Sequence, residues 1–114
     1  MTDFDWNTAH TICELNGFRW VLGPESEDEM NWDDATDWCK SVGGVLPSIA
    51  ILHDSYWNRD IKGSFANGYY WSSSEFDDYR AWLQSFYNYG QKYIVHKSNP
   101  YLVRAVRAIK IGEE

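Results

Sequence analysis

The sequence is poor in cysteine and proline, and it has no long hydrophobic run. Cys13 and Cys39 are its two cysteines, too few for a framework of several disulfides or for a four-cysteine zinc site. No stretch approaches the roughly 18 apolar residues that a membrane-spanning helix requires. Residues 1–5 are acidic, unlike the start of a secretory signal peptide. These absences predict a protein made in the cytoplasm, with no signal peptide and no membrane partner.

Positive charge is scarce in the first half of the chain. The whole sequence has 10 basic and 17 acidic residues, for a net charge of −7. Residues 1–57 contain eleven carboxylates and only Arg19 and Lys40 as bases, whereas residues 58–114 contain six acids and eight bases. A protein that holds phosphates gains affinity by replacing counterions with lysine and arginine, so this balance argues against direct binding of nucleic acid. The acidic half forms either an acidic face or an ordinary solvated helix surface.

Linkers, repeats and low-complexity segments are also lacking, and 114 residues suffice for one modest core. We therefore expect a single domain, residues 1–114, in which residues 1–16 are a candidate peripheral segment. Aromatic residues, in contrast, are abundant: 7 Trp, 8 Tyr and 5 Phe. This content excludes a disordered acidic tail. It also exceeds what a small core needs.

Local signals predict two helices in the first half. Asn31 is a good N-cap for a helix over residues 32–40, and Gly43-Gly44 would end that helix. Ala35, Trp38, Cys39 and Val42 recur at the spacing of one buried face. Ser48 can cap a second helix that starts at Ile49 and stops near Lys62-Gly63.

Short apolar runs between turn residues predict antiparallel strands elsewhere. The expected strands cover residues 17–23, 69–71, 81–86, 93–95 and 102–109. Asn88-Tyr89-Gly90 is expected to form a hairpin turn in which Gly90 takes a positive φ. Two helices with these strands make an α+β domain.

The residue patterns that enzymes and metal sites need are missing. His10, His53 and His96 are isolated, without a spacing that would set two imidazoles on one metal. Cys39 lies in the apolar stripe of its helix, where burial makes a thiol inert. Adjacent carboxylates such as Asp33-Asp34 diverge in a helix or strand, so they do not resemble an acid–base couple. We expect no catalytic activity, no metal and no cofactor.

Two series of residues resemble known families. Residues 30–35 (Met-Asn-Trp-Asp-Asp-Ala), Trp38-Cys39, Gly43-Gly44 and Leu46-Pro47-Ser48 resemble the two-helix opening of C-type lectin-like domains. The second half is similar to the DUF1566 family of phages, prophages and bacterial surface proteins. That similarity rests on Tyr70-Trp71-Ser72-Ser73-Ser74-Glu75, Ala81-Trp82, Phe86, Gly90, Lys97 and residues 103–107 (Val-Arg-Ala-Val-Arg).

Together the two resemblances span residues 17–109 and imply a C-type lectin-like fold. In that fold two helices pack on a small, twisted antiparallel sheet, and the N- and C-terminal strands lie close together. A calcium-dependent sugar site is not expected, because Ser98-Asn99-Pro100 lacks the carboxylates that such a loop supplies. Cys39 matches a cysteine of the family whose usual C-terminal partner is missing, which leaves Cys13 as its partner or no disulfide.

The second series also resembles the variable proteins of diversity-generating retroelements, in which a fixed scaffold carries variable surface positions. Trp71, Trp82 and Phe86 would belong to the scaffold. The positions that would form the ligand-binding surface are Phe76, Asp77, Asp78, Tyr79, Arg80, Leu83, Ser85, Tyr87, Asn88, Tyr89, Tyr93, His96, Asn99 and Tyr101. Their mixture of tyrosine with small polar residues is typical of binding loops.

Two functions remain open at this stage. The first is a non-enzymatic phage or prophage module that recognises a protein or glycan through this tyrosine-rich face. The second is a small acidic inhibitor or decoy that binds a host protein such as a nucleic-acid-binding defence factor. The first places the protein at a virion or phage tail and the second in the host cytoplasm. Homo-oligomerisation is open in both.

Overall fold

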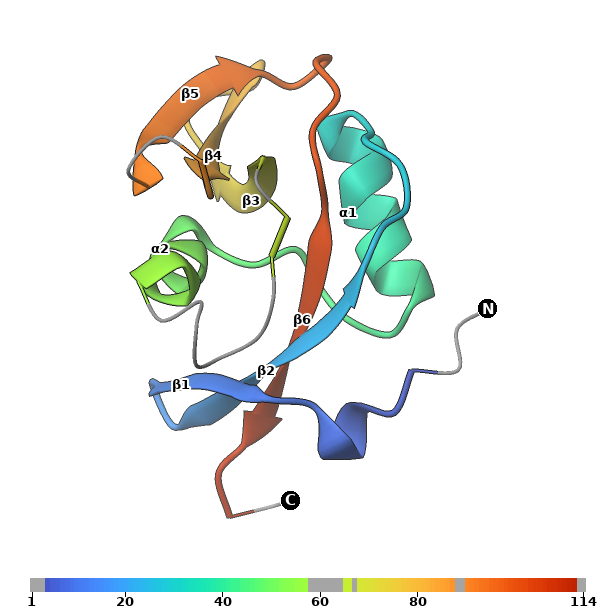
Figure 1. Ribbon diagram of the computed structural model, residues 1–114, viewed down its shortest axis with the longest axis vertical. Helices are drawn as coiled ribbons and strands as arrows, with labels where there is room; N and C mark the ends of the chain where they lie inside the picture. The colour runs from blue at the N-terminus through green and yellow to red at the C-terminus, as the bar shows by residue number, and fades with distance from the viewer. Residues whose placement is uncertain (1–3, 58–64, 67, 88–89, 113–114) are drawn as a thin grey trace.

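The protein is described by a computed structural model that covers residues 4–57, 65–66, 68–87 and 90–112 (Figure 1). Within these ranges the chain forms two α-helices and two three-stranded antiparallel sheets, which confirms an α+β domain. One sheet has the order β1-β2-β6, with β1 Thr11–Leu15, β2 Phe18–Glu25 and β6 Arg104–Lys110. The other has the order β3-β4-β5, with β3 Tyr69–Glu75, β4 Arg80–Ser85 and β5 Lys92–His96.

Both expected helices are present, and their capping residues act as the sequence indicated. Helix α1 spans Trp32–Ser41, and the Asn31 side chain accepts a hydrogen bond from the backbone N–H of Asp34 at 2.9 Å. Gly43 follows it with a φ of 87°, a left-handed conformation that glycine adopts without steric cost. Helix α2 spans Ile49–Trp57, and the Ser48 hydroxyl accepts from the N–H of Ile51 at 3.3 Å. Its predicted end near Lys62-Gly63 lies outside the described residues.

The expected single sheet is replaced by two, which corrects the sequence analysis. Strand β6, the last strand of the chain, pairs with β2. Strands β3, β4 and β5 pair among themselves. The segment just before β6 contacts β3 through one isolated bridge, Tyr70 with Leu102, and contacts the segment before α1 through another, Met30 with Tyr101. Because the bridge to β3 involves one residue pair, the two sheets are linked there without merging.

The N-terminal segment is integral to the domain, although residues 1–16 were a candidate peripheral segment. Strand β1, which the sequence analysis did not predict, pairs with β2 along its length. A short 3₁₀ turn, Trp6–Thr8, precedes it. Trp6 is 8% exposed and donates from its indole N–H to the carbonyl of Val42 at 3.1 Å, while Ile12 is buried in a second apolar cluster. Residues 6–15 therefore contribute to the core instead of lying outside it.

Two of the three aromatic residues assigned to the scaffold are packed in the core. Trp71 is fully buried and Phe86 is nearly so, whereas Trp82 is only half-buried. Cys39 is buried in the main core beside Ala35, as the helical spacing predicted, and burial raises the pKa of its thiol to about 12. No disulfide joins Cys13 and Cys39. Among the described residues, no helix is both long enough and apolar enough to cross a membrane.

Candidate functional site

The strand register of the second sheet places several large side chains on one face. Leu83 of β4 lies opposite Trp71 of β3 and Tyr93 of β5, and directly opposed residues of antiparallel strands share a face. Tyr69 and Val95 are each two residues along their strand from one of these positions, so they point to the same side. Tyr70 points to the other side, where it packs against α2 through Leu52 and Tyr56.

One end of this face is hollowed into a cleft of about 360 Å³. We call it the tyrosine cleft, and its lining residues are Tyr69, Leu83, Tyr93, Val95 and Tyr101. Leu83 is 1% exposed and forms an apolar floor, while the three tyrosines are half-buried. The Tyr93 hydroxyl donates to the side-chain oxygen of Gln91 at 2.7 Å. Within the described part of the chain, the hydroxyls of Tyr69 and Tyr101 bond to no other protein group, so both can bond to a ligand.

The wall formed by Tyr101 is held by backbone and ring contacts. Tyr101 and Met30 exchange two backbone hydrogen bonds, each 3.0 Å long. The Trp71 ring packs against the Tyr101 ring with centroids 5.2 Å apart, and the Trp71 indole N–H donates to the carbonyl of Met30 at 2.9 Å. A buried tryptophan thus fixes the position of a half-buried tyrosine, which reduces the side-chain entropy that the protein would lose on binding a ligand.

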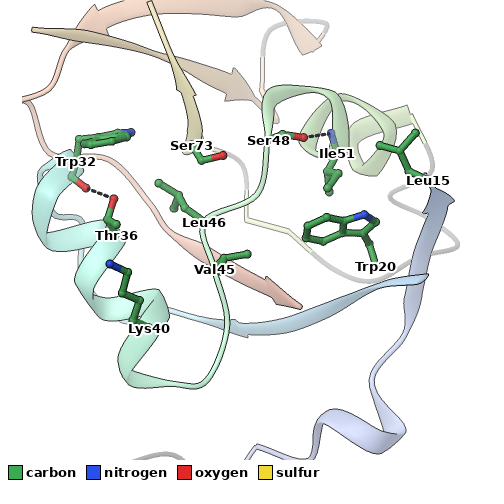
Figure 2. Close-up of a pocket in the computed structure, with 10 residues that line it drawn as sticks. All are labelled: Leu15, Trp20, Trp32, Thr36, Lys40, Val45, Leu46, Ser48, Ile51 and Ser73. Atoms are coloured by element: carbon green, nitrogen blue, oxygen red, sulfur yellow. Dashed lines mark hydrogen bonds between the residues drawn. The ribbon is translucent and has the colours of Figure 1, made fainter. Parts of the chain in front are cut away.

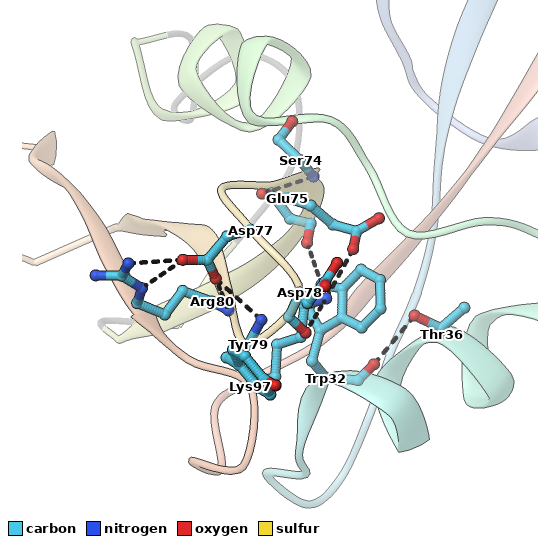
Figure 3. A network of polar contacts seen from close by, with 10 residues as sticks. Trp32, Thr36, Ser74, Glu75, Asp77, Asp78, Tyr79, Arg80 and Lys97 are labelled. Atoms are coloured by element: carbon cyan, nitrogen blue, oxygen red, sulfur yellow. Dashed lines mark hydrogen bonds and ion pairs between the residues drawn. The ribbon is translucent and has the colours of Figure 1, made fainter.

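A second group of expected binding residues forms a rigid turn between β3 and β4 (Figure 3). One oxygen of Asp77 accepts from the backbone N–H groups of Tyr79 and Arg80, at 2.9 and 2.8 Å. The other oxygen pairs with the Arg80 guanidinium at 2.6 Å, and this pairing holds the pKa of Asp77 below its ordinary value. The Arg80 guanidinium also lies 4.8 Å from the centre of the Phe76 ring. The turn presents Phe76 and Tyr79 to solvent, Tyr79 being 69% exposed.

Lys97 ties this turn to helix α1. Its ammonium nitrogen lies 2.7 Å from a carboxylate oxygen of Glu75 and donates to the carbonyl of Asp78 at 3.1 Å. The same nitrogen is 4.3 Å from the centre of the Trp32 ring. Three segments that are distant in sequence therefore meet around one cation, and they keep the turn beside the N-terminus of α1.

Several of the residues expected to bind a ligand lie in neither the tyrosine cleft nor the β3–β4 turn. Ser85 has no exposed surface, which contradicts its assignment to a ligand-binding surface. Its hydroxyl instead accepts from the backbone N–H of Tyr87 at 3.1 Å and so positions the exposed Tyr87. Asn88 and Tyr89 lie outside the described residues.

Leu83 also departs from the expectation of an exposed residue, because it is the floor of the cleft. His96 stacks on Tyr79 with ring centroids 6.5 Å apart, so it belongs to the turn, whereas Asn99 and Asp78 are exposed. Tyr93 and Tyr101 line the cleft, and Tyr87 lies beside it, since each of the three rings contacts Tyr69.

Tyr69, the residue at the centre of the cleft, was not among the expected binding residues. It was assigned to a strand, and the dipeptide Tyr69-Tyr70 gave no direct indication of which ring faces the core. The period of two could have separated them, since Tyr69 must lie on the side opposite to Tyr70.

A second concavity, the apolar groove, lies between α1, α2 and the β1–β2 hairpin (Figure 2). Leu15, Trp20, Val45, Leu46 and Ile51 form its apolar part. Lys40 lies at the α1 side of the groove in Figure 2. The groove has a volume of about 360 Å³, equal to that of the tyrosine cleft. Its polar lining side chains are Thr36, Lys40, Ser48 and Ser73, and the hydroxyls of Thr36 and Ser48 already bond to backbone groups of their own helices.

The ionisable groups that are buried serve the scaffold. Arg104 pairs with Glu25 at 3.3 Å and donates to the carbonyl of Gly23 at 2.7 Å, and burial lowers its pKa. The Tyr70 hydroxyl donates to Glu25 at 2.8 Å, and its pKa is raised by burial first and by Glu25 second. These groups from β2, β6 and β3 satisfy one another, which is the usual condition for burying charge.

Within the described ranges, no three His, Cys, Asp or Glu side chains gather as a metal site would require. The sequence was also compared with models of known protein families and with curated proteins. No family model matches the chain, and no curated protein matches it significantly.

Proposed function

We propose that this protein is a non-enzymatic binding module that recognises a protein or glycan through the tyrosine cleft. The observation that carries the proposal is the contact of Tyr69 with three other tyrosines, Tyr87, Tyr93 and Tyr101, at the edge of an open concavity. Tyrosine provides a large contact area with only two side-chain torsions, so it binds at a low entropic cost. An apolar floor with a few polar groups is the common chemistry of ligand sites.

We also propose that the domain is a variant of the C-type lectin-like fold and of phage or prophage type. Two helices lie between β2 and β3, and the sheet that contains β1 also contains β6. This arrangement supports the fold proposal, because it brings strands from the two ends of the chain together. The family resemblance in residues 70–107 supports a receptor-binding or variable-protein-like role.

The experiment compares two exposed tyrosines at different places. The purified protein is screened against an array of glycans and a library of displayed peptides. Binders are then tested on Tyr87→Ala, whose ring packs on Tyr69 beside the cleft, and on the matched control Tyr79→Ala, at the β3–β4 turn. Both rings are more than half exposed, at 56% and 69%, so neither variant should change the melting temperature appreciably. We expect Tyr87→Ala to abolish binding and Tyr79→Ala to retain it. Equal binding by both variants would rule out the cleft.

An acidic inhibitor or decoy is the second candidate function. The observation in its favour is a series of exposed carboxylates over the β2–α1 loop and the outer face of α1: Glu27, Asp28, Glu29, Asp33, Asp34 and Asp37. Such a field steers a basic partner toward the protein. If Asp33→Asn combined with Asp37→Asn abolishes capture of a basic host protein while Tyr87→Ala does not, the acidic surface is the site.

A further inference from the structure

The three tyrosines that line the cleft are arranged as walls. The Tyr69 ring contacts both the Tyr93 ring and the Tyr101 ring, with centroids 6.1 and 6.0 Å away and interplanar angles of 75° and 72°. Because rings that meet near a right angle are oriented differently, the cleft is bounded by ring surfaces of more than one orientation. The faces of tyrosine rings carry negative electrostatic potential and attract cations.

The protein's own cations occupy other rings. In the described part of the chain, four cations lie within 5.0 Å of an aromatic centroid: Arg80 over Phe76, Lys97 over Trp32, Arg104 over Phe65 and Arg107 over Trp6. Within that same part of the chain, no lysine or arginine lies over a tyrosine of the cleft. The cleft therefore differs from the aromatic surfaces that the scaffold uses internally, and its rings are available to an external cation.

Negative charge lies next to the same cleft. The N–H of Ser26 donates to the carbonyl of Val103 at 2.9 Å, and Met30 pairs with Tyr101, so residues 26–30 run along the segment that carries Tyr101. Between these two attachments lie Glu27, Asp28 and Glu29, all exposed. Three carboxylates on the neighbouring segment favour a cationic ligand and disfavour an anionic one.

We propose that the tyrosine cleft holds a cationic side chain, an arginine or a lysine, from a basic segment of a partner protein. This inference rests on the proposed function, because it names the ligand class of the same site, and it selects a protein over a glycan. The ring walls of Tyr69, Tyr93 and Tyr101 surround the cation, the aliphatic part of the side chain packs on Leu83 and Val95, and the acidic loop attracts the flanking basic residues.

The test uses two peptides that differ only in charge. The acetylated, amidated peptide Gly-Ser-Arg-Ser-Gly and the same peptide with citrulline in place of arginine are titrated into the protein with ¹³C-labelled tyrosine rings. Citrulline keeps the shape and most of the hydrogen bonds of arginine but is neutral. We expect the arginine peptide to shift the ring signals of Tyr69, Tyr93 and Tyr101 and to bind about fivefold more tightly than the citrulline peptide.

Matched variants show whether the rings cause the preference. Tyr93→Leu keeps an apolar side chain but removes one aromatic wall, so it should abolish the preference for arginine, whereas Tyr93→Phe should retain it. Tyr101→Leu and Tyr101→Phe repeat the comparison at another wall in case Tyr93→Leu fails to fold. Glu29→Gln should lower the affinity of the protein for the arginine peptide and make that affinity less dependent on salt concentration.

The outcomes separate this inference from the proposed function. Equal binding of both peptides at the cleft would overturn the cation assignment but leave the cleft as a binding site. A preference for arginine that survives both leucine variants would also overturn it, since the rings would then not be its cause. If neither peptide shifts the three ring signals, the assignment is again wrong. The screen with Tyr87→Ala and Tyr79→Ala then decides separately whether the cleft binds anything else.

Discussion

Lys97 and Trp32 form a cation–π contact across the molecule, with 4.3 Å between the ammonium nitrogen and the ring centre. The Trp32 indole N–H also donates to the carbonyl of Ser72 at 2.8 Å. Through these two interactions, Trp32 connects the start of α1 to β3 and to the segment after β5. Its location explains how a short helix and an exposed turn keep a constant relative position.

Replacing Lys97 should destabilise the protein more than replacing its carboxylate partner. The Lys97 side chain is only 14% exposed, whereas that of Glu75 is 53% exposed. We expect Lys97→Met to lower the free energy of unfolding by about 1–2 kcal/mol. Glu75→Gln should lower it by less than about 0.5 kcal/mol, as is usual for an exposed ion pair. Urea unfolding followed by tryptophan fluorescence measures both, and equal losses would mean that the ion pair outweighs the ring contact.

Gly90 should not tolerate a side chain. It has a φ of 69°, and a Cβ there would overlap the Tyr56 ring, whose Cζ would be 2.8 Å away. Gly90→Ala should cost about 2–4 kcal/mol from overlap and backbone strain together. Gly17→Ala is the matched control, because its φ is 82° but nothing lies within 4 Å of its Cβ position. Strain alone should cost about 1 kcal/mol there. Thermal unfolding that ranked the two glycines equally would argue against the overlap.

The N-terminal segment should be required for stability. Trp6 packs in the main core, and the Arg107 guanidinium lies 4.4 Å from the centre of its ring. We expect Trp6→Ala to lower the free energy of unfolding by about 3–5 kcal/mol, the usual cost of deleting a buried aromatic side chain. The neighbouring exposed Thr8 is the control, and Thr8→Ala should change stability by less than about 0.5 kcal/mol. If deleting residues 1–10 leaves the denaturant midpoint unchanged, the segment is peripheral after all.

The two thiols should differ in reactivity. Cys39 is buried with a pKa raised from 9.0 to about 12, whereas Cys13 is half-buried. Because the thiolate is the reactive form, a disulfide reagent at pH 8 should modify Cys13 in the native protein and Cys39 only after unfolding. Mass spectrometry of the labelled peptides distinguishes the two, and rapid native labelling of Cys39 would contradict its burial.

Cys39 should also make the protein less stable in alkali. A raised folded pKa means that the thiol stabilises the fold fully below about pH 9, and that this stability falls as the pH rises toward 12. Cys39→Ala should therefore flatten the decline of the denaturant midpoint between pH 9 and pH 11 relative to the parent protein. An identical decline in the variant would assign the effect to other groups.

The charge of Arg80 should control the titration of Asp77. The guanidinium contact is the largest cause of the lowered pKa, and the N–H groups of Tyr79 and Arg80 add to it. In Arg80→Gln, the Asp77 carboxyl should titrate closer to its ordinary value of 3.8, as followed by NMR. Because the folded pKa is lowered, the contribution of Asp77 to stability is present above pH 3.8 and disappears as the pH falls through the folded pKa. A pKa that did not move would mean that the backbone N–H groups dominate.

Local elements could be predicted from the sequence because their signals are local. The cap at Asn31, the spacing of Ala35 and Cys39, and the positive φ at Gly90 each depend on a few neighbouring residues. Strand β1 was missed because Thr11–Leu15 alternates weakly, with Ile12 as its single fully buried side chain. Its pairing with β2 is a tertiary effect that overrides a weak local pattern.

The candidate site could be predicted only in part. Tyr87, Tyr93 and Tyr101 were expected on one surface, and the structure brings them to Tyr69. Ser85 was wrongly assigned to the ligand-binding surface, because strand alternation shows which face of β4 it lies on but not that this position is buried.

The sequence alone determined that this is a small acidic α+β domain with more aromatic rings than its core requires. Composition and short-range periodicity suffice for that conclusion, since each element's preference depends on its own residues. Only the tertiary structure decided which rings are packed and which form the cleft. Two sheets, linked by the single-residue bridge Tyr70–Leu102, bury Trp71 and Tyr70 while leaving Tyr69 and Tyr101 half-exposed. Which rings are buried depends on pairings between residues far apart in the chain, and local preferences do not encode such pairings.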